Sequence, residues 1–490
     1  MKRFGIVPAA LAACAALAAC SNDVTTPAVA PRAPSMSAEA DAGQYMVLFK
    51  GNKVPADFEA RVQSLGGSVT FAHAGAGFAA VSGLDAADAA SIGAMNSVSE
   101  VRADMVITLD QTMPAAEMDA AELTEGAADV ANSQANPTTA SRYVWQWNMR
   151  SIHANTAWAA GKLGSAGITV AILDTGLDYD IPDLNGLVDL SRSKSFVPSD
   201  DALATTYFPT RNKITDFNGH GTNVATQVSS KAVALAGVTS RTTLIGVKVL
   251  GRTGSGSLSG VLSGVLWAAD HGANVANMSL GGGFAKSGRG DLVSLINRVF
   301  NYANRKGMMI VVSASNDAAD MDHDGNLLVT YCGVPHVVCV SAVGPEKATA
   351  SPDNVSYYTN YGRSAITVAA PGGNADAAHN FATSAWPWGV DIASWVWSYC
   401  PKNRIASLTP AGAPVLTACV AGNRLSGFIG TSQASPHVAG LAALLMAEYG
   451  TGDLGAIKDR LTSSAIDLGE PGTDPFYGRG RIDVARALGL

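Results

Sequence analysis

The sequence predicts an α/β protein whose main domain is built on a largely parallel sheet covered by helices. Short apolar runs bounded by turn residues recur along the chain, and such runs are typical of strands buried on both faces. Helical stretches such as 257–270 lie between the runs, so strands and helices alternate. Ligands of such sheets bind at the carboxyl ends of the strands, where we therefore expect the chemistry. The predicted strands cover 168–173, 244–250, 274–279, 308–313 and 337–342.

The composition is that of a globular protein and argues against one class of partner. Of the 490 residues, 47% are hydrophobic, which is enough for a large core, and only 15% are charged. The formal net charge is −7, and the chain shows no basic stripe of the kind found in nucleic-acid-binding proteins. We therefore expect no nucleic-acid partner.

The first 20 residues resemble an export signal. Lys2 and Arg3 precede an almost wholly apolar stretch that ends at Cys20, where polar residues follow at once. The stretch is short for a membrane span, and its last four residues resemble the lipobox of bacterial lipoproteins, whose cysteine is acylated. Cys14 ends a similar motif with a thinner apolar region, and an ordinary secretory signal is the alternative. We expect an extracytoplasmic, lipid-anchored precursor that contacts the membrane only through Cys20, followed by a disordered tether over 21–42.

Export makes disulfide bonds the expected state of the four cysteines beyond the signal. These are Cys332, Cys339, Cys400 and Cys419, and four cysteines allow three pairings. Sequential pairing, Cys332–Cys339 and Cys400–Cys419, closes the shortest loops and is the pairing we favour. Unpaired buried thiols are the alternative.

Residues 43–110 form a separate small unit. Its pattern gives the order βαββαβ, which is that of a ferredoxin-like α+β module, a fold that carries many functions. Residues 111–141 lose periodicity and are acidic and alanine-rich, as expected of an exposed linker. The predicted strands cover 45–50, 68–73, 77–82 and 98–107, and the predicted helices cover 56–65 and 85–95.

Three polar residues of the main domain lie in contexts that suit chemistry. Asp174 directly follows the apolar run ending at 173, His220 lies in a glycine-flanked turn, and Ser432 precedes an apolar helix predicted over 438–448. Taken singly, each has an ordinary structural explanation: a turn-forming carboxylate, a loop histidine and a helix N-cap. Their surrounding motifs and their order carry more information than the residues alone.

These motifs resemble those of the subtilisin-like serine proteases, or subtilases. They read Ile172-Leu-Asp-Thr-Gly176, Gly219-His-Gly-Thr222 and Gly430-Thr-Ser-Gln-Ala-Ser-Pro436, in the order Asp, His, Ser that subtilisin has. A fourth segment, Val311-Val-Ser-Ala-Ser-Asn316, matches where the family places its oxyanion-hole asparagine. The resemblance runs from about residue 147 to the last residue. It implies a subtilisin-like three-layer catalytic domain over 142–490 and serine endopeptidase activity.

The resemblance also assigns roles to these residues. A serine hydroxyl is a weak nucleophile at neutral pH, so His220 is expected to take the proton from Ser432 and return it to the leaving amine. Asp174 is expected to hold the imidazole in the right tautomer, and Asn316 to donate to the oxyanion. The family's substrate-pairing edge corresponds to Ser279-Leu280-Gly281, and the neighbouring specificity pocket to Ala314 and Ser315.

The small N-terminal unit gains a role from the same resemblance. Many subtilases carry a βαββαβ propeptide that assists folding, inhibits the site and is then cut away. Residues 43–110 are expected to be this inhibitor, with self-cleavage between Leu109 and Arg142. That cut would release the catalytic domain from its lipid anchor. The expected partners are polypeptide substrates and the chain's own propeptide, with the catalytic domain a monomer.

The chain departs from the family pattern at several positions. Asn223 stands where a second histidine is common, and Ser315 stands where glycine is common. Asp183 matches an aspartate of the family's calcium site, but the segment 229–238 is too short to complete that site. Residues 374–425 are longer than the usual connection, which indicates a disulfide-stapled insertion near the active site.

The expected chemistry needs no cofactor, although one loop has the composition of a structural calcium site. The loop Asp320-Met-Asp-His-Asp-Gly-Asn326 resembles the start of a calcium-binding loop with Asp320, Asp322 and Asp324 as ligands. Tyr331 stands where an EF-hand has its glutamate, so a solvated acidic turn is the alternative.

Three functions have to be separated: a protease of broad specificity, a maturation protease or peptide ligase with one substrate, and a catalytically silent scaffold. The presence of Asp174, His220, Asn316 and Ser432 argues against the silent scaffold.

Overall fold

The computed structural model describes residues 43–109, 116–119, 130–287, 290–329, 331–347, 349–375 and 394–490. The predicted signal with Cys20, the tether over 21–42 and much of the predicted linker lie outside the described residues. Within the described ranges, every helix is either too short or too polar to cross a lipid bilayer.

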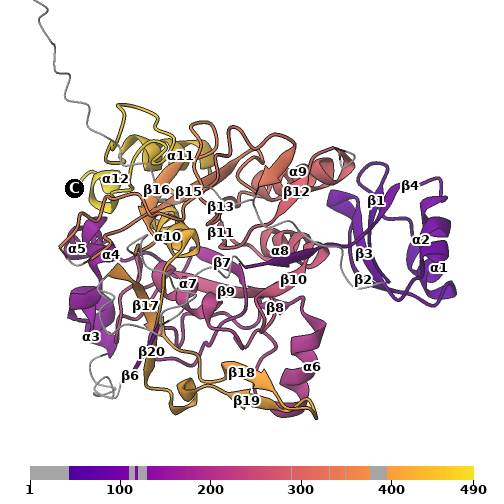
Figure 1. Cartoon of the computed structure of the whole chain (residues 1–490), viewed down its shortest axis with the longest axis horizontal. Coiled ribbons are helices and arrows are strands. Elements are labelled where there is room, and N and C mark those ends of the chain that lie inside the picture. Colours follow the sequence, from indigo (N-terminus) through magenta and orange to yellow (C-terminus); the bar gives the residue numbers. More distant parts are fainter. Residues whose placement is uncertain are drawn as a thin grey trace, which may run out of the picture.

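The main domain is built on a seven-stranded sheet in which all neighbouring strands are parallel (Figure 1). The strand order is β16-β15-β13-β11-β7-β9-β8. All five predicted strands lie in this sheet, and the prediction of a largely parallel sheet is confirmed. The short edge strands β8 and β16 were not predicted. The strands are β7 (Thr169–Asp174), β8 (Lys194–Ser195), β9 (Thr243–Lys248), β11 (Val275–Met278), β13 (Met309–Ser313), β15 (Val337–Val343) and β16 (Val368–Pro371).

Helices cover both faces of the sheet, which gives three layers. Alternate residues of β7 point to opposite faces: Val170 and Ile172 pack with α7 (His220–Val228) and α10 (Thr431–Tyr449), whereas Leu173 packs with helices of the other face. The helices of that other face are α8 (Leu258–Asp270) and α9 (Gly290–Arg305). The predicted three-layer α/β architecture is therefore confirmed.

Smaller elements complete the main domain. They are α4 (Trp147–Ser151), α5 (Ala154–Ala159), α6 (Pro198–Tyr207), α11 (Leu454–Ser463), α12 (Val484–Leu488), β12 (Gly283–Ala285) and β14 (Leu327–Val329).

The N-terminal module has the order βαββαβ and a four-stranded antiparallel sheet, β2-β3-β1-β4. One face of this sheet packs on the module's own helices, and the other face, through Met46, Leu48 and Phe78, shares a core with α8 and α9 (Figure 1). The module is therefore docked on one helical layer of the main domain. Its elements are β1 (Gln44–Phe49), α1 (Phe58–Ser64), β2 (Ser68–His73), β3 (Phe78–Ser82), α2 (Ala86–Gly93) and β4 (Val98–Ala103).

The single strand predicted over 98–107 is wrong, because the chain forms two strands there. β4 ends at Ala103, and β5 (Val106–Thr108) pairs instead with β10 (Ser255–Ser257) of the main domain. Between them, the buried carboxylate of Asp104 accepts hydrogen bonds from the backbone N–H of Ser259, at 3.0 Å, and from the Ser259 hydroxyl. These bonds satisfy donors at the start of α8, where a negative charge is favoured.

The predicted linker over 111–141 is also structured in part. β6 (Ala116–Asp119) pairs antiparallel with β20 (Arg424–Phe428), and α3 (Val130–Ala135) belongs to the main domain. Gln134 Nε2, for example, donates to the Ser240 carbonyl oxygen at 2.6 Å. The main domain therefore begins near residue 130 rather than at 142.

Residues 394–425 of the insertion predicted over 374–425 pack over the loop that carries His220. Asn223 Nδ2 donates to the Val396 carbonyl oxygen at 3.2 Å, and the Ile405 N–H donates to the Phe217 carbonyl oxygen at 2.9 Å. The structure pairs Cys400 with Cys419 across this insertion, and Cys332 with Cys339 elsewhere. The strands of the insertion are β17 (Val396–Tyr399), β18 (Ile405–Leu408), β19 (Pro414–Leu416) and β20.

Candidate active site

Asp174 and His220 form a buried pair at the carboxyl end of the sheet. Asp174 is the last residue of β7 and has no solvent exposure, and His220 is the first residue of α7. His220 Nδ1 lies 2.8 Å from Asp174 Oδ1 and 3.0 Å from Oδ2. Gly221 permits this approach, because a Cβ there would lie 2.2 Å from the Gly176 carbonyl oxygen. The pair is thus fixed by the strand end, the helix start and one obligatory glycine.

A second aspartate, Asp216, holds the histidine loop in place. Its buried carboxylate accepts hydrogen bonds from the N–H groups of Gly219 and Thr222, at 2.9 and 3.0 Å, and from the hydroxyl of Thr175 at 3.0 Å. Sequence reasoning missed Asp216, although its place four residues before His220 was a usable signal. The hydrogen bonds connect the loop that carries His220 to the strand end that carries Asp174.

Opposing effects act on the pKa of His220. Burial, the largest effect, would lower it, but the charge of Asp174, its hydrogen bond to the ring and the charge of Asp216 oppose burial. The net result is a pKa above the ordinary value of 6.5. Such an imidazole accepts a proton readily near neutral pH, as a general base must.

Ser432 and Asn316 come together at the start of α10. Asn316 Oδ1 accepts hydrogen bonds from the Thr431 N–H and hydroxyl, at 2.8 and 2.9 Å, which fixes the orientation of the Asn316 amide. A Cβ built on Gly430 would lie 3.6 Å from Asn316 Nδ2 and 3.7 Å from the Ser432 backbone nitrogen. Two N–H donors therefore border the same small space beside Ser432.

Helix α10, which carries Ser432, and helix α7, which carries His220, are joined by a hydrogen bond between two side-chain amides that sequence reasoning missed. Gln433 Nε2 donates to Asn223 Oδ1 at 3.3 Å, so the residue after Ser432 bonds the residue three positions after His220. The Phe428 ring also lies edge-on to the His220 ring, with centroids 6.2 Å apart. Asn223, noted in the sequence only as a departure, is thus part of the structure that connects α7 to α10.

The Ser432 hydroxyl donates to the Ser279 carbonyl oxygen at 3.3 Å in this structure. Active-site hydrogen bonds are commonly longer or differently directed before substrate binds, so this geometry is compatible with a nucleophile.

The predicted substrate edge lies directly beside Ser432, and β5 occupies it. Ser279 Oγ donates to the Ser432 carbonyl oxygen at 2.7 Å, and Leu280 next to it is buried. Gly281 forms an antiparallel bridge with Thr108, while the Leu109 N–H donates to the Gly254 carbonyl oxygen at 2.8 Å. The segment 106–109 therefore lies between two backbone segments as an added strand.

The two residues predicted beside the specificity pocket follow β13. Ala314 is fully buried, and Ser315 has a φ of 72°, in the left-handed region where glycine is favoured. The Ser315 carbonyl oxygen accepts from the Asn360 N–H at 3.0 Å, which helps to hold this conformation. The glycine that the family commonly has at this position thus has a conformational explanation.

The structure gives no support to calcium at Asp320, Asp322 and Asp324. Their carboxylates have separate partners: His323 for Asp320 at 2.8 Å, Ser364 for Asp322 at 2.6 Å and Lys286 for Asp324 at 3.3 Å. Among the described residues, no cluster of three or more His, Cys, Asp or Glu side chains is arranged to hold a metal ion. The loop thus has the internal partners expected of an acidic turn, and calcium binding there stays a prediction.

Asp183, the family's calcium aspartate, has a backbone substitute for a cation. Its carboxylate accepts hydrogen bonds from the N–H groups of Val233, Ala234 and Leu235 at 2.8, 3.0 and 3.2 Å. Such a nest of N–H groups supplies positive potential without an ion. The short segment after α7 thus supplies N–H groups to Asp183 where the family's calcium site has a longer loop.

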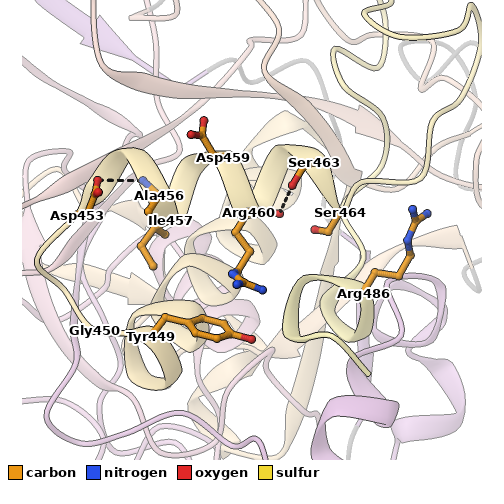
Figure 2. A pocket seen from close by; sticks show the side chains of 10 residues that line it. All are labelled: Tyr449, Gly450, Asp453, Ala456, Ile457, Asp459, Arg460, Ser463, Ser464 and Arg486. Atoms are coloured by element: carbon orange, nitrogen blue, oxygen red, sulfur yellow. Dashed lines mark hydrogen bonds between the residues drawn. The ribbon is translucent and has the colours of Figure 1, made fainter.

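A hollow of about 680 Å³ lies far from these residues, where α10, α11 and α12 meet (Figure 2). Tyr449, at the end of α10, borders it, so about 25 Å of helix separates it from Ser432. Asp459 and Arg460 contribute opposite charges to its lining. It is not part of the candidate active site.

Comparison with known proteins assigns the family. The model of the subtilase family matches residues 165–480. The chain belongs to the subtilase family. It is 30% identical over 347 residues to the thermophilic serine proteinase of Bacillus sp. strain AK1, covering 70% of this chain and 67% of the relative. It is 28% identical to thermitase of Thermoactinomyces vulgaris, covering 70% and 95% of the two chains.

Solved structures extend the likeness of this subtilase beyond the catalytic domain. The epidermin leader peptide processing serine protease of Staphylococcus aureus aligns with a TM-score of 0.70 over 92% of this chain and 99% of its own. At 21% identity this likeness shows the fold alone. Together with the family match, it establishes a subtilisin-like fold, and the family and its named relatives establish serine-type endopeptidase activity on polypeptides.

Proposed function

We propose that this subtilase is an exported, self-processing endopeptidase whose nucleophile is Ser432. The observation that carries the proposal is the convergence of the Asp174–His220 pair with Ser432 and two N–H donors at the carboxyl end of one sheet. In subtilases these groups have to meet in one place, and here they are carried by four separate elements: the end of β7, the start of α7, the start of α10 and the segment after β13.

The chemistry follows from the contacts. Ser432 Oγ attacks the substrate carbonyl carbon while His220 Nε2 takes the hydroxyl proton, and Asp174 stabilises the resulting imidazolium. The carbonyl oxygen becomes an oxyanion, to which Asn316 Nδ2 and the Ser432 N–H donate. His220 then protonates the leaving amine, and water repeats the sequence to release the acyl group from Ser432.

The docked strand β5 supports self-processing and favours one position for the first cut. Thr108 pairs antiparallel with Gly281. In an antiparallel pair, a bound polypeptide two positions further along than Thr108 would face Ser279, whose carbonyl oxygen bonds the Ser432 hydroxyl. We assign the first cut to the bond between Asp110 and Gln111. Residues 43–110 would then remain as an inhibitor until they are degraded.

The proposed localisation of the enzyme follows from the N-terminal signal together with this cut. We propose that Cys20 carries the lipid in the precursor and that the cut separates this anchor from the catalytic domain, which acts as a monomer. Calcium is not part of the proposal.

One comparison tests the proposal. Wild type, Ser432→Ala and the control Ser407→Ala, an exposed serine of β18, are expressed as full precursors. Wild type and Ser407→Ala are expected to be cut after residue 110, to react with an active-serine phosphonate and to degrade casein, whereas Ser432→Ala does none of these. Equal processing of all three without phosphonate labelling would contradict the mechanism, and catalytic domain found only in membranes would contradict its release.

A further inference from the structure

The strand that leads to Ser432 carries a second segment of the precursor on its edge. β20 ends at Phe428, four residues before Ser432, and β17 occupies one of its edges. β6 occupies the other edge as an antiparallel strand. The paired positions are Gly427 with Ala116, Ser426 with Glu117, Leu425 with Met118 and Arg424 with Asp119.

β5 and β6 therefore place two segments of the precursor on the two backbone edges that adjoin the proposed nucleophile, one beside Ser279 and one on the strand that leads to Ser432. β5 pairs with β10 and Gly281, the side that receives the residues before the cut. β6 follows it in the chain after residues 110–115 and pairs with β20, the strand that leads to Ser432. A polypeptide cut after residue 110 thus has its sixth to ninth following residues on β20.

We propose that the edge of β20 is a distal substrate site that binds an extended polypeptide several residues beyond the cut bond. The inference rests on the proposed function, because it assigns β6 the position that a substrate takes. Recognition by strand addition uses backbone hydrogen bonds, so this site selects for extended, unfolded chains of sufficient length rather than for a sequence.

The edge is held in place independently of β6. The Cys400–Cys419 disulfide joins the end of β17 to the segment before β20. The Trp395 and Trp397 rings pack against Gly427, where a Cβ would lie 3.0 Å from either ring. A rigid edge of this kind needs little ordering when a peptide adds to it, which favours binding.

β6 is also a competitor for this site after the first cut. The following helix α3 is fixed to the main domain through Gln134 and Ser240, which exchange hydrogen bonds of 2.6 and 2.7 Å. A strand tethered so closely has a high effective concentration at β20. The distal site is therefore expected to open fully only when β6 can no longer pair.

Two processed enzymes test the inference. In one, Glu117→Pro and Met118→Pro remove two backbone donors of β6, and in the matched control the same positions become alanine, which keeps both donors. The substrates are internally quenched peptides of the chain's own sequence: 104–113, 104–122, and 104–122 with the amides of 117 and 118 N-methylated. Neighbouring N–H groups point to opposite edges of a strand, so two consecutive methylations block whichever donor faces β20. A peptide methylated at 120 and 121 controls for methylation itself.

In the enzyme with Glu117→Pro and Met118→Pro, called the proline enzyme, we expect kcat/KM for the peptide 104–122 to exceed that for the peptide 104–113 about tenfold or more. A tenfold factor is equivalent to ~1.4 kcal/mol. Methylation at 117 and 118 should remove the gain, methylation at 120 and 121 should preserve it, and the alanine enzyme should show a smaller gain. Equal cleavage of short and long peptides by the proline enzyme, or no effect of methylation at 117 and 118, overturns the distal site alone. Failure to cleave either peptide overturns the proposed function and the distal site with it.

Discussion

Acid should destabilise this protein through one buried histidine of α10. His437 has no solvent exposure: its Nδ1–H donates to the Gln433 carbonyl oxygen at 2.8 Å, and its Nε2 accepts from Asn148 Nδ2 at 2.9 Å. With Nε2 engaged as an acceptor, the ring is neutral and has no room for a second proton. Burial lowers the pKa of His437 to about 4 from the ordinary value of 6.5.

The sign and size of the effect follow from this shift. The unfolded chain binds a proton at this ring below pH 6.5, whereas the folded chain does so only below about pH 4. Stability is therefore intact above pH 6.5 and falls as the pH drops from 6.5 to 4. A shift of this size corresponds to about 3 kcal/mol, at roughly 1.4 kcal/mol per pKa unit.

Guanidinium unfolding at a series of pH values measures the effect. The Ser432→Ala background prevents self-digestion, and His437→Gln in that background removes the titrating ring. Between pH 7.5 and pH 4, the background should lose about 3 kcal/mol more free energy of unfolding than the variant. The carboxylates titrate in both proteins and cancel in the difference. Parallel pH dependences of the two proteins would refute the assignment to His437.

Three further outcomes test the site and its surroundings. Asn316→Ala should lower kcat with little change in KM, by about the 10²–10³ known for the corresponding donor of subtilisin, and an unchanged kcat would remove Asn316 from the oxyanion site. Because the pKa of His220 is raised, kcat/KM of the wild-type enzyme should increase with pH, with a midpoint above 6.5. Asp174→Asn should lower kcat by about 10⁴, and retention of the wild-type kcat would contradict the Asp174–His220 pairing. Replacing Cys400 and Cys419 by serine opens a 19-residue loop and should cost about 3 kcal/mol of unfolding free energy, measured by denaturation of the Ser432→Ala background; an unchanged midpoint would show that the bond does not constrain the unfolded chain.

Local sequence carried the information for the centre of this fold and site. Strands such as β7 are buried on both faces, so they appear in the sequence as unbroken apolar runs. Asp174 ends one such strand and Asn316 follows another. His220 and Ser432 lie in the first turns of helices, and all four motifs could be identified without knowledge of packing. Glycines such as Gly221 are explained by the close backbone contacts that the structure shows.

Contacts between distant segments could not be obtained in this way. Asp104 divides a predicted strand because it bonds Ser259, 155 positions later in the chain. β6 exists through its pairing with β20, so its own residues carry no clear strand pattern. Calcium binding at Asp320, Asp322 and Asp324 stays a prediction: the loop composition suggested a ligand set, whereas in the structure each carboxylate has its own partner, such as Lys286 for Asp324. The composition of a loop cannot show which group, distant in the sequence, will form an ion pair or hydrogen bond with a carboxylate.

Residues 394–425 of the insertion predicted over 374–425 are best understood as support for the loop that carries His220 rather than as an added surface loop. Phe217 and Asn223 lie on the two sides of His220 in the chain, and both form hydrogen bonds with the backbone of the insertion. Beyond the end of β7, the Lys402 N–H of the insertion donates to Asp178 Oδ2 at 2.8 Å. The chain lacks the second histidine that is common at position 223, and an asparagine in its place can bond both the insertion and Gln433. The same insertion carries the edge of β20, so the element that stabilises the histidine loop also presents the proposed distal site. Loss of the insertion should therefore impair catalysis on short peptides as well as long ones, which distinguishes it from loss of the distal site alone.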